Sequence, residues 1–306
     1  MEPVESPPAG FRLVREDGAI GWIRDGFDFL LADGGRSGRV EPWPRPARPD
    51  PSSSRLEDAG PYRGRGEVVR VPIPASPGEH ALVRHYRRGG LVRHLLSDQY
   101  PGRERFFREV RTTERARSLG IPAPEVLGVR AERIGWGFYR GDLMTRQIPG
   151  SRDLGEYLEG CLGSSRKPQG PSRDEILTAV AGLLRCMHDR GLVHADLNVK
   201  NVLLRFRAGA VDAFIIDLDR ARLGAPVCKA LRVQNLERLY RSLEKQGLLG
   251  PVVTDRDVSS FIGAYALEDS GLESRLLQRL RRGSGTLRWH HFWWRLAGGS
   301  GKRSGT

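Results

Sequence analysis

Lysine is the residue type that this chain lacks most clearly. Only five of its 50 basic residues are lysines, and the first of them is Lys167. The first half of the chain therefore cannot place a lysine against a phosphate group, and arginine is the residue type that can provide a permanent positive charge there. Arginine keeps its charge, and its planar fork can bind two phosphate oxygens at once.

Cysteines and long apolar runs are also scarce. The three cysteines, Cys161, Cys186 and Cys228, are an odd number without paired metal-binding spacing, so we expect reduced thiols in a cytoplasmic protein. No apolar run is long enough for a membrane-spanning helix. The N-terminus has neither the basic start nor the apolar core of a signal peptide. We therefore expect a globular protein with no transmembrane segment.

Acidic residues are too few to balance the basic ones, and the net charge is +13. This excess predicts attraction to an anionic partner such as membrane headgroups, a phosphorylated lipid or nucleic acid. Between Arg84 and Arg117, ten arginines stand against four acids, although a solvated helix face would look the same. Residues 287–296 combine three of the six tryptophans with basic residues. That pattern suits either a bilayer interface or a helix packed into the core.

What the chain does contain is a pair of polar motifs, one in residues 193–204 and one in residues 215–220. The first has the pattern His-x-Asp-x4-Asn, with His194, Asp196 and Asn201, and the second supplies Asp217 and Asp219. Phosphoryl transfer needs a carboxylate that orients the attacking hydroxyl and accepts its proton, together with oxygen ligands for Mg²⁺. Asp196 is the candidate for the first role. Asn201, Asp217 and Asp219 are the candidate metal ligands.

The segments around the first motif match the context that it requires. Ser172 to Glu175 has the pattern of a capping box, and apolar residues follow at helical spacing until Gly191 ends the predicted helix. Strands are predicted at 202–204 and 213–216. A helix, a loop and two short strands in this order favour a catalytic loop. The alternative is that His194 and the aspartates are ordinary polar residues of loops between core strands.

Both motifs differ from those of protein kinases. Where protein kinases have His-Arg-Asp-Leu-Lys, this chain reads His-Ala-Asp-Leu-Asn over 194–198, and Asp-Leu-Asp at 217–219 replaces Asp-Phe-Gly. The chain instead resembles the bacterial lipopolysaccharide-core sugar kinases. Within them it is most similar to the 3-deoxy-D-manno-octulosonic acid (Kdo) kinase family, with which it shares the stretches 82–91 and 235–243. The resemblance runs from about Gly60 to about Lys245.

The resemblance implies an enzyme that uses ATP and Mg²⁺ to phosphorylate a Kdo sugar of a lipid A precursor at the cytoplasmic face of the inner membrane. The implied partners are this lipid-linked acceptor and an anionic membrane surface, and no nucleic acid is expected. No Ala-Pro-Glu element or long activation segment follows Asp219, which favours a small or lipid-linked acceptor over a protein. The sequence does not indicate the oligomeric state.

The implied fold is α+β, a two-lobed protein-kinase-like fold with a small antiparallel-sheet N-lobe and a mainly helical C-lobe. We expect an N-terminal extension with a Pro-rich linker at 1–59, the N-lobe at 60–147 and the C-lobe at 148–306. In the extension, residues 19–23 and 27–31 are apolar enough to add a strand or helix to the N-lobe.

The N-lobe residues expected at the nucleotide follow from the same resemblance. Arg84, on an apolar strand, occupies the position of the missing phosphate-binding lysine. Glu109 on the next helix is its expected carboxylate partner, ahead of Glu104 and Glu114. A surface ion pair of Glu109 with a helical neighbour is the alternative. Gly64 and Gly66 lie in a loop that either approaches the phosphates or is a plain turn. Gln147 belongs to the 145–150 segment expected to pack against adenine.

Two other functions fit the motifs less well. A small-molecule phosphotransferase of the aminoglycoside or choline kinase type shares His-x-Asp-x4-Asn, but its substrate pocket is usually acidic. A non-catalytic protein that binds anionic surfaces or nucleic acid would use the charge of +13 without any chemistry.

Overall fold

The computed structural model describes residues 4–16, 18–27, 68–74, 76–86, 98–162, 171–267 and 269–280. The chain divides into two compact units. The first is assigned residues 1–152, 203–205 and 213–223, and the second is assigned 153–202, 206–212 and 224–306. Gly64, Gly66, the Pro-rich segment and the tryptophan-rich segment at 287–296 lie outside the described residues.

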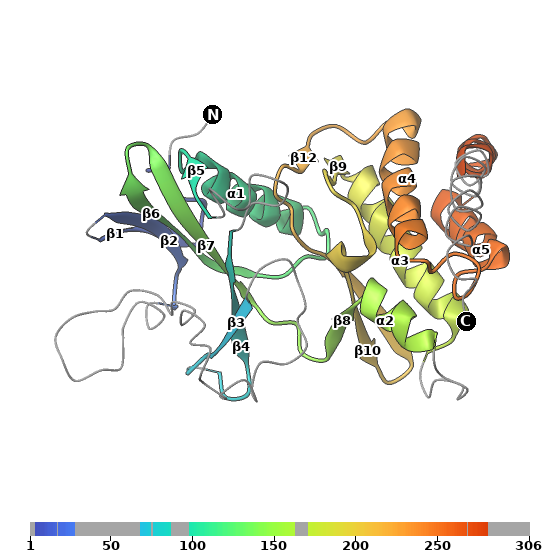
Figure 1. Ribbon diagram of the computed structural model, residues 1–306, viewed down its shortest axis with the longest axis horizontal. Coiled ribbons are helices and arrows are strands. Elements are labelled where there is room, and N and C mark those ends of the chain that lie inside the picture. Colours follow the sequence, from blue (N-terminus) through green and yellow to red (C-terminus); the bar gives the residue numbers. More distant parts are fainter. Residues whose placement is uncertain are drawn as a thin grey trace, which may run out of the picture. The chain divides into compact units, whose positions relative to one another are not determined.

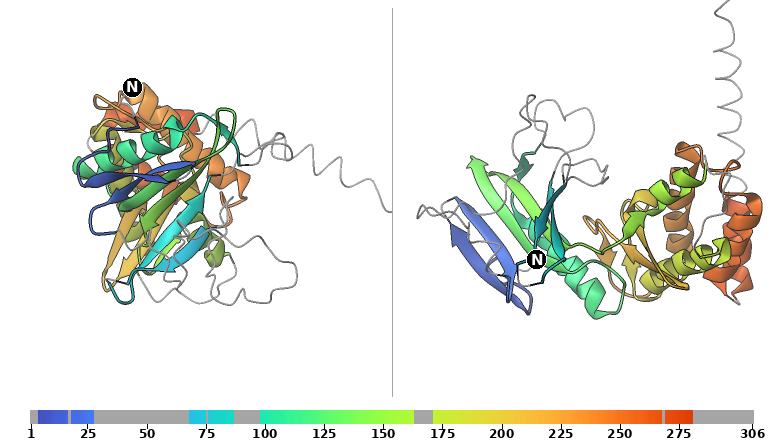
Figure 2. Two further views of the ribbon diagram at one scale, coloured as in Figure 1. Left: turned by 90° about the vertical axis from the view of Figure 1, so that its left-hand side faces the viewer. Right: turned by 90° about the horizontal axis from the view of Figure 1, so that it is seen from below.

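The first unit is built on an antiparallel sheet (Figure 1). Its strand order is β1-β2-β6-β7-β4-β3, and β5 pairs with β7 at one end. The strands are β1 (Phe11–Glu16), β2 (Ala19–Arg24), β3 (Val68–Pro72), β4 (His80–His85), β5 (Tyr100–Pro101), β6 (Val126–Gly135) and β7 (Phe138–Arg146). Residues 19–23, expected to add either a strand or a helix, form most of β2, and the hairpin that β2 forms with β1 extends the sheet beyond β6 (Figure 2).

Helix α1 (Glu104–Ser118) packs against this sheet through β6 and β7. Phe106, Phe107 and Val110 recur at helical spacing and are fully buried in the core of the unit. The helix ends at Ser118. Gly120 adopts a φ of 78°, a left-handed conformation that glycine enters without a Cβ clash. The helix is thus fixed in register against the sheet.

The second unit is mainly helical. Its helices are α2 (Leu154–Cys161), α3 (Arg173–Asp189), α4 (Lys229–Lys245) and α5 (Asp255–Ala266), and residues 270–280 are also helical. The capping box predicted for α3 is confirmed, because Ser172 and Glu175 each bind the other's backbone N–H. Gly191 follows α3 with a φ of 81°, and a Cβ there would lie 2.0 Å from the carbonyl oxygen of Gly224. Only glycine fits this position.

Short strands flank the polar motifs. They are β8 (Ser151–Asp153), β9 (Leu192–Val193), β10 (Val202–Arg207), β11 (Ala210–Ile215) and β12 (Arg222–Leu223), with the 3₁₀ turn η3 (Val199–Asn201) just before β10. The strands β11, β10 and β8 form a small sheet in that order. Both strands predicted after the first motif are therefore present, β10 with a longer end and β11 with an earlier start.

The α+β class with an antiparallel-sheet lobe and a mainly helical lobe is confirmed by these two units. Within the described part of the chain, none of the helices combines the length and apolar character needed to cross a bilayer.

Candidate active site

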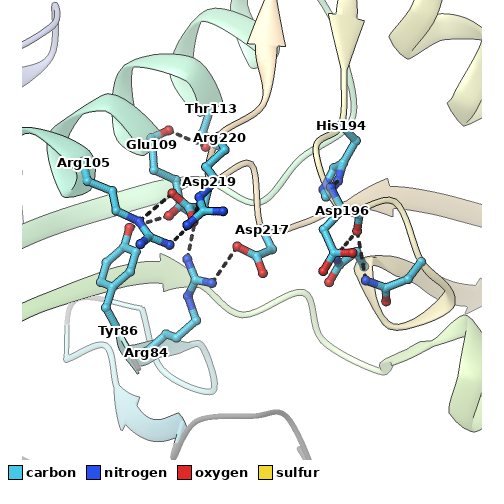
Figure 3. A network of polar contacts seen from close by, with 12 residues as sticks. Arg84, Tyr86, Arg105, Glu109, Thr113, His194, Asp196, Asp217, Asp219 and Arg220 are labelled. Atoms are coloured by element: carbon cyan, nitrogen blue, oxygen red, sulfur yellow. Dashed lines mark hydrogen bonds and ion pairs between the residues drawn. The ribbon is translucent and has the colours of Figure 1, made fainter. Parts of the chain in front are cut away.

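Strand β4 presents Arg84 between two carboxylates of the first unit. Its Nη2 atom donates to Glu109 Oε1 on α1 at 2.6 Å, and its Nη1 atom donates to Asp217 Oδ1 at 2.8 Å (Figure 3). Burial opposes the charge of Arg84, but Glu109 and Asp217 raise the pKa of the guanidinium well above its usual value. The expected Arg84–Glu109 pair is present, and it leaves Arg84 charged at any working pH.

Glu109 is more deeply buried than a surface ion pair would allow. Its side chain is 2% exposed, and Oε2 accepts a hydrogen bond from the hydroxyl of Tyr86. Burial raises the pKa of Glu109 to about 7, although Arg84 and Tyr86 favour its charged form. The tyrosine was missed in the sequence, where only its place in the shared stretch 82–91 singles it out.

Asp217 and Asp219 follow β11 and differ in their surroundings. Asp217 has a φ of 60°, a left-handed conformation that aspartate tolerates better than most residues, and its side chain is 39% exposed. Both oxygens of Asp219 are held by Arg105 of α1, one of them by Nε at 3.0 Å. Arg105 was also missed as a site residue, although it lies one helical turn before Glu109.

The second unit contains the loop with Asp196. The ring Nδ1 of buried His194 accepts from the backbone N–H of Asp196 at 3.1 Å, so this histidine braces the loop. The side-chain amide of Asn201 donates to the backbone oxygen of Asp196 at 2.8 Å, as does that of Asn198 at 2.9 Å. The loop therefore closes on itself, while the Asp196 side chain remains exposed.

Asn235 on α4 holds the backbone of this loop, a role that the sequence did not predict. Its Oδ1 atom accepts from the backbone N–H of His194 at 3.3 Å, and its Nδ2 atom donates to the backbone oxygen of the same residue at 2.7 Å. The Nε2 atom of His188 lies 3.0 Å from Asn235 Oδ1, and its Nδ1 atom lies 2.7 Å from the Tyr265 hydroxyl. Because Oδ1 can only accept, Nε2 carries the His188 proton.

Neutral His188 makes the second unit sensitive to acid. Burial is the main reason that the pKa of His188 falls from 6.5 to about 4. The unfolded chain therefore binds the proton more tightly than the folded chain does. The contribution of neutral His188 to the free energy of unfolding is complete above pH 6.5 and is lost as the pH falls toward 4. We expect denaturant unfolding to show a loss of about 2 kcal/mol from this group between pH 7 and pH 5. A His188→Gln variant should lose that part of the pH dependence, and an unchanged slope would contradict the assignment.

Two side chains offer oxygen ligands of the kind that Mg²⁺ prefers. Asp217 presents a partly exposed carboxylate, and Asn201 turns its amide nitrogen to the loop, which leaves its carboxamide oxygen as the possible ligand. In the part of the chain that the structure describes, no three His, Cys, Asp or Glu side chains form a preformed metal site. Magnesium commonly takes only one or two protein carboxylates and completes its shell with phosphates and water, so a partly exposed carboxylate such as that of Asp217 fits the ion.

Gln147 directly follows β7. Its backbone N–H donates to the carbonyl oxygen of His80 at 2.8 Å, and its Oε1 atom accepts from Arg70 Nε at 3.0 Å. The segment expected to pack against adenine is therefore tied by this residue to β3 and β4.

The first unit thus contains a strand arginine paired with a helix glutamate and with an aspartate two residues after β11. The second unit contains a braced His-x-Asp-x4-Asn loop. The model of the lipopolysaccharide kinase (Kdo/WaaP) family matches residues 61–265, and the chain belongs to this family. It is therefore a kinase.

Curated relatives agree with this assignment. A 3-deoxy-D-manno-octulosonic acid kinase of Vibrio cholerae is 30% identical over 215 residues, which are 69% of this chain and 81% of the relative. The kinase of the same name from Actinobacillus succinogenes is 29% identical over 212 residues, covering 68% of this chain and 84% of that protein. A solved structure described as WaaP in complex with acyl carrier protein matches with 19% identity and a TM-score of 0.45, covering 72% of this chain and 87% of that one.

Proposed function

We propose that this kinase transfers the γ-phosphoryl group of ATP to a hydroxyl of a Kdo sugar on a lipid A precursor. The proposal is supported above all by the family match over residues 61–265. The names of the curated relatives support Kdo as the acceptor sugar. The arginine fork between Glu109 and Asp217 supports a site for phosphate oxygens.

Each site residue has a proposed role in this reaction. Asp196 orients the sugar hydroxyl and accepts its proton, and Arg84 binds phosphate oxygens of the nucleotide. Glu109 fixes the direction of the Arg84 fork. Asn201 and Asp217 hold Mg²⁺, which would neutralise charge on the phosphates. Asp219 is the third predicted metal ligand, and its carboxylate would have to release Arg105 before it could bind the ion. Gly64 and Gly66 would approach the phosphates, and Gln147 would contact adenine.

The proposed partner surface is an anionic membrane, because the acceptor is a lipid and the net charge of +13 favours anionic headgroups. The proposed location is therefore the cytoplasmic face of the bacterial inner membrane. Moderate salt should weaken binding to anionic vesicles more than it weakens ATP binding, because surface attraction is screened beyond about 10 Å at 0.1 M.

A transfer assay with Mg-ATP tests the proposal directly. A Kdo-bearing lipid A precursor, a free aminoglycoside and a generic protein are offered in parallel, and only the lipid should be labelled. Labelling of the aminoglycoside or the protein alone would refute the Kdo assignment and favour the other phosphotransferase classes. Binding to anions without any transfer would favour a non-catalytic protein.

A further inference from the structure

The N-terminal hairpin lies outside the segment that defines the family, yet it is part of the same sheet. The family match begins at residue 61, whereas β1 and β2 occupy residues 11–24. β2 pairs with β6 in a continuous antiparallel register from Ala19 to Ile23 (Figure 2). Trp22 and Ile23 are completely buried there. The hairpin therefore lies outside the matched family segment, and its side chains form part of the core of the first unit.

Helix α1 is covered on the face opposite its site residues. Arg105 and Glu109 each lie two residues from Phe107, which places them about 200° around the helix from it. Arg111 and Glu114 lie one and two turns after Phe107 and share its face. One face of α1 thus carries the contacts to Arg84 and Asp219, and the other face is available to the N-terminal segment.

The contacts on this second face come from residues 4–24. The Trp22 ring packs edge-on against Phe107 with centroids 4.6 Å apart, and the Arg111 guanidinium lies 4.6 Å from the centre of the same ring. Arg111 Nη2 also donates to the backbone oxygen of Ser6 at 2.9 Å. The indole N–H of Trp22 donates to the backbone oxygen of Val4 at 2.8 Å.

Two ion pairs add to this contact. Arg24 Nη2 lies 2.6 Å from Glu114 Oε2, and both side chains are 17% exposed. At the start of the helix, Arg103 Nη2 lies 2.8 Å from Glu5 Oε1. The N-terminal segment therefore holds α1 at its beginning, its middle and its last turns, through apolar and charged contacts together.

We propose that residues 4–24 position α1 and thereby set the alignment of Glu109 with Arg84, with Arg111 and Arg24 as positioning residues for the kinase reaction. The helix can move its site face only if its other face slides over Trp22. Since the holding segment belongs to the same chain, the Arg84–Glu109 pair forms without a partner protein. The consequence for nucleotide affinity rests on the proposed role of Arg84.

The test compares Arg111→Ala with Arg111→Lys and with Arg115→Ala, an exposed arginine of the same helix. Calorimetry of Mg-ATP binding needs no acceptor. We expect the dissociation constant to rise about tenfold in Arg111→Ala, the effect of losing roughly one charged hydrogen bond. Arg111→Lys should recover part of the affinity, because an ammonium can still lie over the Trp22 ring. Arg115→Ala should bind as the parent does.

A double-mutant cycle separates positioning from general damage. In a Glu109→Gln background, Arg111→Ala should have almost no further effect, because the alignment that it disturbs is already lost. An equal effect in both backgrounds, or no effect in either, would overturn the proposal. Hydrogen exchange of α1 should also be faster in Arg111→Ala than in Arg115→Ala. If the parent does not bind Mg-ATP, the proposed function fails, and the exchange comparison alone decides the positioning role.

Discussion

Replacing Asp196 by asparagine is expected to lower kcat by about 10²- to 10⁴-fold while leaving the affinity for ATP unchanged. An amide keeps the size of the carboxylate but cannot accept the hydroxyl proton, and general-base catalysis contributes an effect of this order. The loop itself should remain intact, because its hydrogen bonds use the backbone of Asp196 and not its carboxylate. Steady-state transfer to the lipid acceptor measures the change.

Asp174→Asn is a matched control, because Asp174 is an exposed aspartate in the first turn of α3 in the same unit. It should transfer phosphate at the parent rate. Full activity in Asp196→Asn would remove Asp196 from the catalytic role. A large loss of thermal stability in that variant would show instead that the carboxylate is structural.

Arg84→Ala is expected to reduce kcat/KM for ATP by about 10²- to 10³-fold, the usual cost of removing one preorganised donor to a transferring group. The variant also leaves Glu109 buried without its cation. Because the pKa of Glu109 is already raised to about 7, the carboxyl can protonate, and this limits the loss of stability to about 1–3 kcal/mol. Steady-state kinetics at varied ATP and denaturant unfolding separate the two effects.

Arg84→Lys gives a sharper comparison. Lysine keeps the charge, but its ammonium lacks the planar fork that reaches Glu109 and Asp217 together. Activity between that of the parent and Arg84→Ala would support the fork geometry. Arg133→Ala, at an exposed arginine of β6, should have parental kinetics. Parental kinetics in Arg84→Ala would exclude a phosphate-binding role for Arg84.

Much of the local structure could be predicted because its causes are local. The capping box at Ser172, the glycine after α3 and the apolar strands around the polar motifs each depend on a few neighbouring residues. The apolar pattern of residues 19–23 alone does not distinguish a strand from a helix. The Asp-Gly pair at 17–18 is the sequence signal that favours a tight hairpin between two strands.

The residues that the sequence did not predict are joined by contacts between distant parts of the chain. Arg105 binds Asp219, 114 positions away, and Asn235 binds the backbone of His194, 41 positions away. Such contacts depend on how distant segments pack together. They cannot be predicted from the periodic pattern of residues within one segment. The pair of Arg84 with Glu109 was predictable only because the family resemblance supplied the expectation of a helix carboxylate.

The burial of Glu109 has a consequence for how nucleotide binding is observed. On the proposed role of Arg84, phosphate oxygens would share the guanidinium that now favours the charged form of Glu109. The pKa of Glu109, about 7 without nucleotide, would then rise further. Near neutral pH the complex would therefore take up a proton from the buffer. The heat of ATP binding would therefore depend on the ionisation enthalpy of that buffer. ATP binding to this kinase would be coupled to the uptake of a proton.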